Sequence, residues 1–538
     1  MKTNHWLILI LVLAAALRLY GLSRGDTVND EVFYGFRAVG MMDFDEAAEQ
    51  TTPLEWLDPS TSSGQAPIPS WTKLSFHDHP PLVFWIQHFS IALFGENNFA
   101  LRFPSALLGV LSVYLLYLIG QALYSPSAGL VGAAFMAATL NSVYISRVGM
   151  QESYVIFFLL LSIYFFLKSL RKENYLIWTG VALGFGLLTK YNVFILVPIF
   201  LTYLAFFRRD YFKSAGWRKK LGIGAVLALI IFSPVIVYNL KLYQTAGHFD
   251  FQFSHILGQN PEVWQIQPGK EIGTISDRIQ NLIPRLIDSH SWLFLAIFAI
   301  SLLAISKLSF VLITFIWLLL LLLLIGPSYR FLTVLTPFMA LISAVFLARF
   351  DKKIFLVPII LFEIFYSINN QIAYYPVGAS PWLSSKVRFE NYNWGYNALG
   401  EFFASELKNK MPAIRFEAKY RFIEEKQDRS LELAKKRGFE PYPAMIVTYG
   451  NFDRGAKLWV LDRLHIYHGW PVIDLETYFN YLQENGFDYY QRVGFKHYYF
   501  ILSANIVPSP EFQTLIQKTQ FISIFNPRGE EVFKVYKI

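Results

Sequence analysis

The chain contains no cysteine, and only 16% of its 538 residues are charged. The absence of cysteine excludes disulfide bonds, thiolate nucleophiles and thiolate metal ligands. A soluble protein of this length has about a quarter charged residues, so the low charge argues against an ordinary soluble protein. Hydrophobic residues make up 54% of the chain and the mean hydropathy is +0.36. These values indicate a polytopic α-helical membrane protein with some soluble mass.

Apolar segments of about 20 residues, the length that crosses a bilayer, recur through the first two thirds of the chain. We count about 11 candidate spans, at residues 6–22, 99–123, 128–145, 151–169, 175–189, 191–207, 221–240, 291–306, 308–326, 330–348 and 353–372. The first is predicted to be a retained span and not a cleaved signal peptide. No small-x-small cleavage site follows it, and Arg18 interrupts its apolar run.

The distribution of lysine and arginine predicts an orientation. With the N-terminus in the cytoplasm, the inner loops hold most of these residues, which is the positive-inside pattern. Residues 23–98, 241–290 and everything after 373 then lie on the extracytoplasmic side. This bias accounts for much of the net charge of +8. We expect no nucleic-acid partner, because no basic run is interleaved with stacking aromatic residues.

We predict two parts, a transmembrane domain over residues 1–372 and a soluble α/β domain over 373–538. Within the outer interfacial loop 23–98, DEVFYGFRAVGMM and PPLVFWIQHFSIALF have the pattern of interfacial helices, and 46–75 has the composition of a mobile loop. In the soluble domain, AMIVTY, KLWVLD and HYYFILS are typical of short buried strands. ALGEFFASELKNK and ETYFNYLQENGF are typical of helices.

Two adjacent carboxylates, Asp30 and Glu31, follow the first span almost immediately. Charged groups at this depth are costly, so they often have a function, although a carboxylate near a helix start also complements the helix dipole. Adjacent residues on a helix point about 100° apart, so the two cannot act on the same atom. One could be a general base while the other binds a metal, an arginine or the backbone.

A second polar motif, His77-Asp78-His79-Pro80-Pro81, precedes an apolar helix. Imidazole and carboxylate groups suit a divalent metal. Glu31 and His79 are therefore candidate ligands for a divalent metal, and the sequence indicates no other cofactor. His77 is a candidate supporting residue. An interfacial histidine that only forms hydrogen bonds is the alternative.

Cations form a third set, at the predicted outer ends of the spans. They are Arg102, Arg147, Lys190 and Arg330, and Arg147 is followed closely by Gln151 and Glu152. Such residues often extend to lipid headgroups. As a group they could bind a phosphate at the membrane surface, since arginine gives a bidentate fork for it. Two carboxylates and several cations suit a reaction in which a lipid-linked phosphate leaves and an acceptor hydroxyl is activated.

The motifs DEVFYGFRA, HDHPPLVFW and ALRFPSALLGVLSVYLLYLIG, in this order, resemble the GT-C-type integral membrane glycosyltransferases of the protein O-mannosyltransferase and aminoarabinose transferase superfamily. LGFGLLTKYNVFILVP and SYRFLTVLTPFMAL are similar to its later spans, and NYNWGYNALGEFFASEL is similar to a stretch after the last span of bacterial members. The resemblance covers about residues 5–350. It implies a GT-C-like fold and an inverting transfer of a sugar from a polyprenyl phosphate.

The resemblance also implies roles for single residues. Asp30 matches the catalytic acidic residue, Glu31 its supporting neighbour, and Arg102 an arginine near the lipid phosphate; His79 begins the His-Pro-Pro motif. Many members have an aspartate after the third span, where this chain reads RVGMQES. Glu152 would have to substitute for it, also as a candidate metal ligand. The C-terminal domain does not match the extra domain of the eukaryotic protein mannosyltransferases, so a protein acceptor is not implied.

The sequence therefore predicts a glycosyltransferase that uses a polyprenyl-phosphate sugar, in contact with membrane lipid and an acceptor glycan, lipid or protein. Asp30 is the expected base, and Lys190 and Arg330 join Arg102 and Arg147 as candidates for the donor phosphate. A transporter or flippase of a lipid-linked substrate, or a non-catalytic membrane scaffold, is the alternative. A transporter should place charges or broken helices near the membrane midplane, often in inverted repeats, and the notable charges here lie at span ends.

Overall fold

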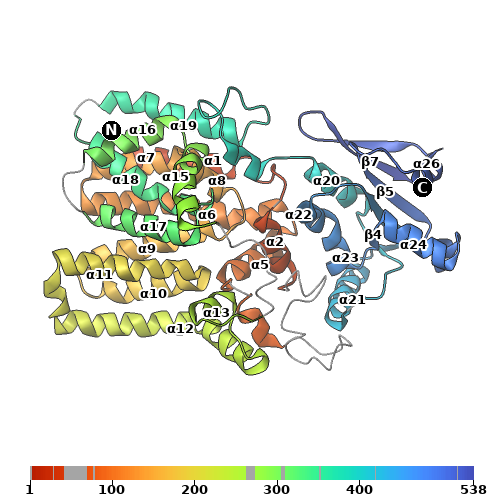
Figure 1. Ribbon diagram of the computed structural model, residues 1–538, viewed down its shortest axis with the longest axis horizontal. Coiled ribbons are helices and arrows are strands. Elements are labelled where there is room, and N and C mark those ends of the chain that lie inside the picture. Colours follow the sequence, from red (N-terminus) through yellow and green to blue (C-terminus); the bar gives the residue numbers. More distant parts are fainter. Residues whose placement is uncertain are drawn as a thin grey trace. The chain divides into compact units, whose positions relative to one another are not determined.

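The computed structural model describes residues 3–27, 29–41, 69–76, 79–261, 273–304, 309–350, 353–418, 420–517 and 519–538. The chain forms two compact units (Figure 1). The first unit comprises Met1–Leu22 and Ser70–Asn391, and the second comprises Ser23–Pro69 and Tyr392–Ile538. The sequence-based boundary after residue 372 assigned 23–69 to the membrane part, whereas these units group that segment with the C-terminal residues. The acidic pair therefore belongs to the second unit.

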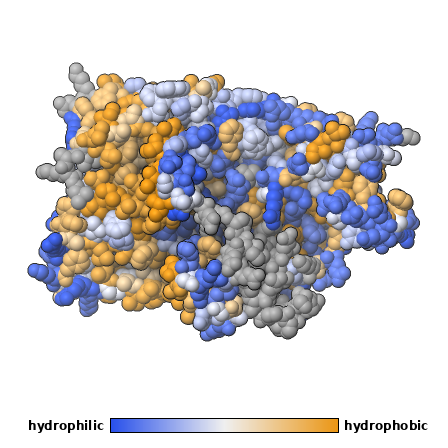
Figure 2. Space-filling model, in the orientation of Figure 1, coloured by the Kyte–Doolittle hydropathy of each residue, from blue (hydrophilic) through white to orange (hydrophobic). Residues whose placement is uncertain are grey.

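The first unit is helical, and each predicted span corresponds to a helix or a pair of helices. Its main helices are α1 (Thr3–Leu19), α6 (Asn98–Leu123), α7 (Pro126–Ala138), α8 (Leu140–Ser146), α9 (Glu152–Ser169), α10 (Tyr175–Thr189), α11 (Leu196–Phe207), α12 (Ala215–Ala246), α16 (Trp292–Leu303), α17 (Phe310–Ile325), α18 (Thr336–Leu347) and α19 (Leu356–Gln371). Among the described residues, α6, α9 and α12 are each long and apolar enough to cross a membrane, and the bent pair α7–α8 would be a fourth span. The larger number of spans stays a prediction. The surface of this unit is largely hydrophobic over its helices (Figure 2).

The break between α7 and α8, a bend of 62°, is stabilised by a buried arginine. Thr139 ends α7 in an extended conformation and α8 begins at the next residue. Arg18 of α1 is fully buried, and its guanidinium group donates hydrogen bonds to the carbonyl oxygens of Ala14, Met136 and Ala137 and to the hydroxyls of Ser142 and Ser146. The carbonyls of Met136 and Ala137 are among those that the end of α7 leaves unpaired. Gly109 of α6 lies close by, where a Cβ atom would be 2.9 Å from Nε of Arg18.

Three short helices of this unit belong to the predicted outer segments. They are α5 (Leu82–Phe94), α13 (Phe251–Ile256) and α15 (Ile275–Ser289). Helix α5 confirms the helix predicted from PPLVFWIQHFSIALF, and its 13 residues are too few to cross a bilayer alone. Residues 46–68 of the mobile loop predicted over 46–75 lie outside the described part of the chain, as does His77.

Helix α15 is amphipathic and exposes a row of isoleucines. Ile275, Ile279 and Ile283, spaced four residues apart on one face, are each more than half exposed. On the neighbouring flank, Arg278 donates to the carbonyls of Leu323 and Leu324 at the end of α17, and Arg285 donates to the carbonyl of Pro327 at 2.6 Å. The arginines thus fix the helix to the protein and leave the isoleucine face uncovered by the described residues.

The second unit contains a five-stranded sheet in the order β4-β3-β5-β7-β6. The strands are β3 (Ala444–Tyr449), β4 (Val472–Asp474), β5 (His497–Ser503), β6 (Phe521–Phe525) and β7 (Glu531–Lys537). Strands β4, β3 and β5 are parallel, with Ile446 opposite both Val472 and Tyr499, and β7 pairs antiparallel with β5 and β6. Two further strands, β1 (Lys410–Pro412) and β2 (Glu440–Tyr442), form a separate parallel pair.

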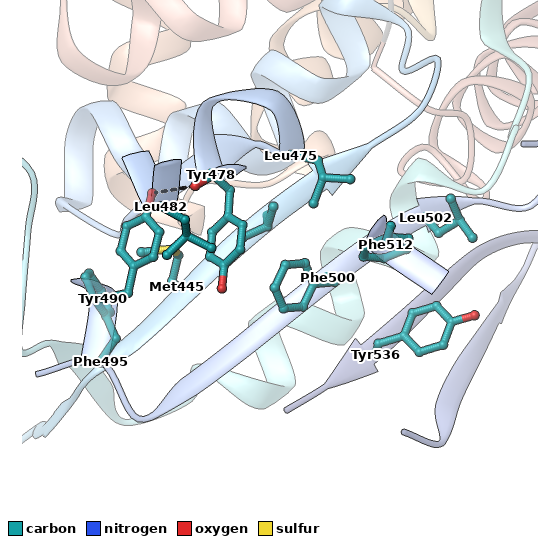
Figure 3. Packing of buried hydrophobic residues seen from close by; sticks show 11 residues of the cluster. Met445, Leu475, Tyr478, Leu482, Tyr490, Phe495, Phe500, Leu502, Phe512 and Tyr536 are labelled. Atoms are coloured by element: carbon teal, nitrogen blue, oxygen red, sulfur yellow. Dashed lines mark hydrogen bonds between the residues drawn. The ribbon is translucent and has the colours of Figure 1, made fainter. Parts of the chain in front are cut away.

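Helices precede these strands or lie between them along the chain, which gives an α/β arrangement. They are α20 (Tyr396–Glu406), α21 (Arg421–Lys436), α22 (Arg454–Lys457), α23 (Arg463–His468), α24 (Leu475–Asn485), α25 (Tyr489–Val493) and α26 (Pro510–Ile516). The core is rich in aromatic residues from the sheet, α24, α25 and α26 (Figure 3). The stacked rings of Tyr478 and Tyr490, 4.8 Å apart, lie beside Phe500 of β5. The strands predicted from AMIVTY and HYYFILS and the helices predicted at α20 and α24 are confirmed.

The prediction of a strand over KLWVLD is wrong. Asp453 accepts a hydrogen bond from the backbone N–H of Ala456 and so caps α22, which continues into the π-helical segment η8 (Leu458–Asp462). Residues 458–461 are all buried. A short run of apolar residues that is buried on every side has no period that separates a strand from a helix.

Helix α2 (Asp30–Gly40) is the predicted helix after the first span, and it packs on the C-terminal residues. Val32 and Phe36 are fully buried, and the ring of Phe36 lies 4.8 Å from that of Tyr467 in α23. The hydroxyl of Tyr467 donates to the carbonyl of Phe36 at 2.7 Å, and Nζ of Lys426 donates to the carbonyl of Gly40. The apolar face of α2 is therefore covered by protein.

We predict that the isoleucine face of α15 lies in the apolar part of the membrane interface, as amphipathic helices do. The chain has no cysteine, so Ile279→Cys allows a single nitroxide label in vesicles. Its electron paramagnetic resonance signal should respond more to oxygen, which dissolves in lipid, than to a water-soluble nickel chelate. The control is Asn281→Cys, on the polar face, which should show the reverse. Equal access of the nickel chelate to both labels would contradict the prediction.

Candidate functional site

The acidic pair begins helix α2. Asp30 is half-buried, and Glu31 is buried with 1% of its surface exposed. The preceding residue, Asn29, has φ 55° and ψ −150°, a combination that is unfavourable for a residue with a side chain. A general base must be reached by its substrate. The partial exposure of Asp30 and the burial of Glu31 therefore suit a base and a supporting residue in that order.

A second cluster lies in the first unit, where Glu152, Lys190 and Arg330 come together. Glu152 is in the first turn of α9, and Lys190 follows the last residue of α10. Nζ of Lys190 is 2.8 Å from Oε1 of Glu152. The ring of Phe331 contacts both cations, with its centre 4.7 Å from Nζ of Lys190 and 4.8 Å from Cζ of Arg330. Arg330 is also close enough to Glu152 to interact with its charge.

Two buried polar side chains of this cluster have unused hydrogen-bonding atoms. Oε2 of Glu152 accepts no hydrogen bond from the described residues, and the side-chain amide of Gln151 has no partner among them through either of its polar atoms. Both residues are at least 98% buried. Buried polar atoms are rarely left unpaired in proteins. Together with two cations, they indicate a place for a polar or anionic ligand.

The other two predicted cations bind the chain at the end of α1. Arg147 is buried, and its Nη1 and Nη2 atoms donate to the carbonyls of Leu17, Arg18, Tyr20 and Gly21 at 2.9–3.3 Å. Nη1 of Arg102, which is fully buried, donates to the carbonyl of Leu22 at 3.1 Å. The structure thus shows both arginines fixing the chain just before it enters the second unit. Their binding of a donor phosphate stays a prediction.

The segment before α5 holds the histidine motif. The backbones of His79 and Phe76 exchange two hydrogen bonds, at 2.7 and 3.0 Å, and the hydroxyl of Ser75 donates to the carbonyl of His79. The described residues contain no group of three His, Cys, Asp or Glu side chains that could hold a metal ion. The candidate ligands Glu31, His79 and Glu152 therefore stay a prediction, and Glu31 belongs to a different unit from the other two.

A hydrogen-bonded network around Asp250 was not found from the sequence. Asp250 is fully buried and caps α13, and its Oδ2 atom accepts from the hydroxyl of Tyr191 at 2.6 Å and from Nδ2 of Asn239 at 3.0 Å. Burial raises the pKa of Asp250, and its hydrogen bonds oppose this shift. Tyr191 directly follows Lys190, so the network fixes the backbone that carries this cation. The only sequence signal was an aspartate in a predicted outer loop, which is not specific.

Several known proteins are similar to this chain over part of its length. The family described as dolichyl-phosphate-mannose-protein mannosyltransferase matches residues 78–238. YkcB of Bacillus subtilis, grouped by name with mannosyltransferases, is 27% identical over 282 residues, which are 49% of this chain and 37% of that protein. The undecaprenyl phosphate-alpha-4-amino-4-deoxy-L-arabinose arabinosyl transferase of Pseudomonas paraeruginosa is 29% identical over 198 residues, 35% of each chain. The chain thus spans about a third of the length of the relatives it matches.

A solved structure is similar over the whole chain. The crystal structure of ArnT from Cupriavidus metallidurans bound to undecaprenyl phosphate has a TM-score of 0.56 and 14% sequence identity, and the similarity covers 100% of this chain and 98% of that one. At this identity the likeness establishes the fold. The similarity predicted from the sequence motifs is confirmed.

We predict that Arg147→Ala lowers the stability of the protein. Four carbonyl oxygens at the end of α1 would lose their donor in a buried position, which we expect to cost about 3 kcal/mol. The measurement is the unfolding temperature of the purified protein in detergent. Arg171→Ala, at an exposed arginine, is the control and should leave it unchanged. An unaltered unfolding temperature for Arg147→Ala would show that these hydrogen bonds do not stabilise the fold.

Proposed function

On the basis of its GT-C-type fold, we propose that this chain is a glycosyltransferase that moves a sugar from a polyprenyl-phosphate donor to an acceptor hydroxyl. The observation that carries the proposal is the cluster of Lys190, Arg330 and Glu152, with its buried and unpaired carboxylate oxygen. Further support comes from the relatives, whose names refer to dolichyl-phosphate-mannose and to an undecaprenyl phosphate sugar. We place the reaction at the extracytoplasmic face of the membrane, as the charge bias predicts.

In the proposed reaction, Asp30 accepts the proton of the acceptor hydroxyl. The hydroxyl oxygen forms a bond with the anomeric carbon while the bond from that carbon to the phosphate oxygen breaks, so the configuration inverts. The electron pair leaves with the polyprenyl phosphate. Lys190 and Arg330 stabilise its negative charge, as preorganised cations do for a leaving group. Glu31 supports Asp30.

We expect Lys190 to exchange partners when the donor binds. In this structure its ammonium group pairs with Glu152, and a phosphate would give it a second anionic partner. Glu152 would then hold the ammonium group in place from one side while the phosphate binds from the other. Its second carboxylate oxygen stays open for a hydroxyl of the sugar.

The first test is a panel of polyprenyl-phosphate sugars offered to the purified protein, in which consumption of one donor identifies the sugar. Asp30→Asn should abolish most of this activity, by on the order of 100-fold or more, because the amide cannot accept the proton. Circular dichroism and the unfolding temperature control for folding. Full activity of a well-folded Asp30→Asn protein would exclude Asp30 as the base.

The second test concerns the phosphate. Lys190→Ala should lower kcat/KM for the donor by on the order of 100-fold, the usual effect of removing one stabilising group from a developing charge. Lys172→Ala is the matched control, because this lysine is exposed at the end of α9 that is remote from Glu152 in sequence. If both substitutions had the same small effect, Lys190 would not bind the donor phosphate.

A transporter of a lipid-linked substrate is the second candidate, because α7–α8 is a broken helix and α19 carries the fully buried Glu363. Reconstituted vesicles separate the two functions. A glycosyltransferase consumes the donor and releases polyprenyl phosphate, whereas a transporter moves the intact lipid to the other leaflet. Movement without consumption would favour the transporter.

A further inference from the structure

The loop between the first helix and the acidic pair is bound tightly to the start of the C-terminal domain. The carboxylate of Asp26 accepts hydrogen bonds from the backbone N–H groups of Trp394, Tyr396 and Asn397, at 2.6, 3.2 and 2.8 Å. Asp26 is fully buried, and its own N–H donates to the carbonyl of Tyr392 at 2.9 Å. These donors are at the beginning of α20, where a helix leaves N–H groups unpaired and favours an anion.

Side chains of the C-terminal domain also donate hydrogen bonds to the carbonyls of the same loop. Nδ2 of Asn397 donates to the carbonyls of Ser23, Arg24 and Gly25, at 3.0–3.1 Å, and Nδ2 of Asn393 donates to the carbonyl of Arg24 at 2.7 Å. Residues 23–26 thus supply the carboxylate, three carbonyls and the N–H of Asp26, and residues 392–397 supply the remaining N–H groups and the carbonyl of Tyr392. We call this set of hydrogen bonds between residues 23–26 and 392–397 the clamp.

The clamp ends four residues before Asp30, and the residue directly before Asp30 has a strained backbone. Asn29 has an unfavourable backbone conformation, which persists only where the surrounding structure imposes it. Helix α2 is fixed at its other end by Tyr467 and Lys426. The two carboxylates therefore sit at the first turn of a helix that the second unit holds at both ends.

We infer that Asp26 and Asn397 are positioning residues for the acidic pair, an inference that rests on the proposed function of Asp30. They act through the backbone of residues 23–26, which leads to α2, and do not touch the substrate. A general base must come within about 3 Å of the proton that it removes, and a displacement of about 1 Å can lower the rate on the order of 100-fold. The C-terminal domain is thus part of the catalytic apparatus, because it determines where Asp30 lies.

The test uses full-length protein and a graded series of substitutions. Asn393→Ala removes one hydrogen bond of the clamp, Asn397→Ala removes the three that its side chain donates, and Asp26→Ala removes the three that its carboxylate accepts. We expect kcat to fall slightly for the first and on the order of 100-fold for the last two. The KM for the donor should change by less than about twofold, because the phosphate cluster of the first unit is intact.

Asn485→Ala is the matched control, since it also removes a hydrogen bond from an asparagine side chain to a carbonyl, that of Tyr481 in α24, and this bond belongs neither to the clamp nor to α2. It should keep kcat near that of the unaltered protein. Amide hydrogen exchange of the peptide 23–34 should become faster in Asp26→Ala and Asn397→Ala and stay unchanged in Asn485→Ala. This readout separates displacement of the loop from general unfolding of the domain.

The inference is overturned if Asn397→Ala keeps full kcat, or if the loss of activity across the series follows the unfolding temperature and not the number of clamp bonds removed. It is also overturned if the exchange of peptide 23–34 is unaltered. Asp30→Asn in the same assay tests the proposed function separately. If that variant were fully active, the base would be wrong, while the exchange data would still show whether the clamp fixes α2.

Discussion

A cation that is buried in an apolar helical unit needs oxygen partners. The free-energy cost of burying an unpaired charge can exceed the whole free energy of unfolding of a protein. Arg18 meets this requirement with carbonyls and hydroxyls at a broken helix, and Arg147 with carbonyls at the end of α1. Lys190, which is partly exposed, pairs with a carboxylate instead. Carbonyl partners belong to the backbone and hold a cation permanently, whereas an ion pair with a second open oxygen can accommodate another group. This difference separates the structural cations from the candidate site.

The division of the chain into two units has a consequence for the proposed reaction. The acidic pair is folded with the C-terminal domain, and the cluster of Lys190, Arg330 and Glu152 belongs to the helical unit. The proposed base and the proposed phosphate-binding groups thus belong to different units of the protein. The clamp at Asp26 explains how a loop that follows the first helix can be fixed by residues more than 360 positions later. The clamp also gives a physical role to the NYNWGYN stretch. From the sequence alone, this stretch could only be described as similar to one in bacterial members of the superfamily.

Much of this architecture could be predicted from the sequence. The length of the apolar segments predicts the helices of the first unit, short apolar runs predict β3 and β5, and a helical pattern that ends at a glycine predicts α24. The run KLWVLD was misread because buried residues on all sides remove the period. The sequence predicts four cations at the outer span ends, but it does not tell which of them bind backbone carbonyls and which belong to the candidate site. The hydrogen bonds from Arg147 to the end of α1 depend on how the helices pack. The roles of Asp26 and Asn397 could not be predicted, because their partners are far away in the chain.

The most direct test of the central claim is a structure of the full-length protein in a lipid environment with bound polyprenyl phosphate. We predict that the phosphate lies at about 3 Å, the distance of a charge-assisted hydrogen bond, from Nζ of Lys190 and from the guanidinium group of Arg330. A phosphate bound away from both of these residues would contradict the account.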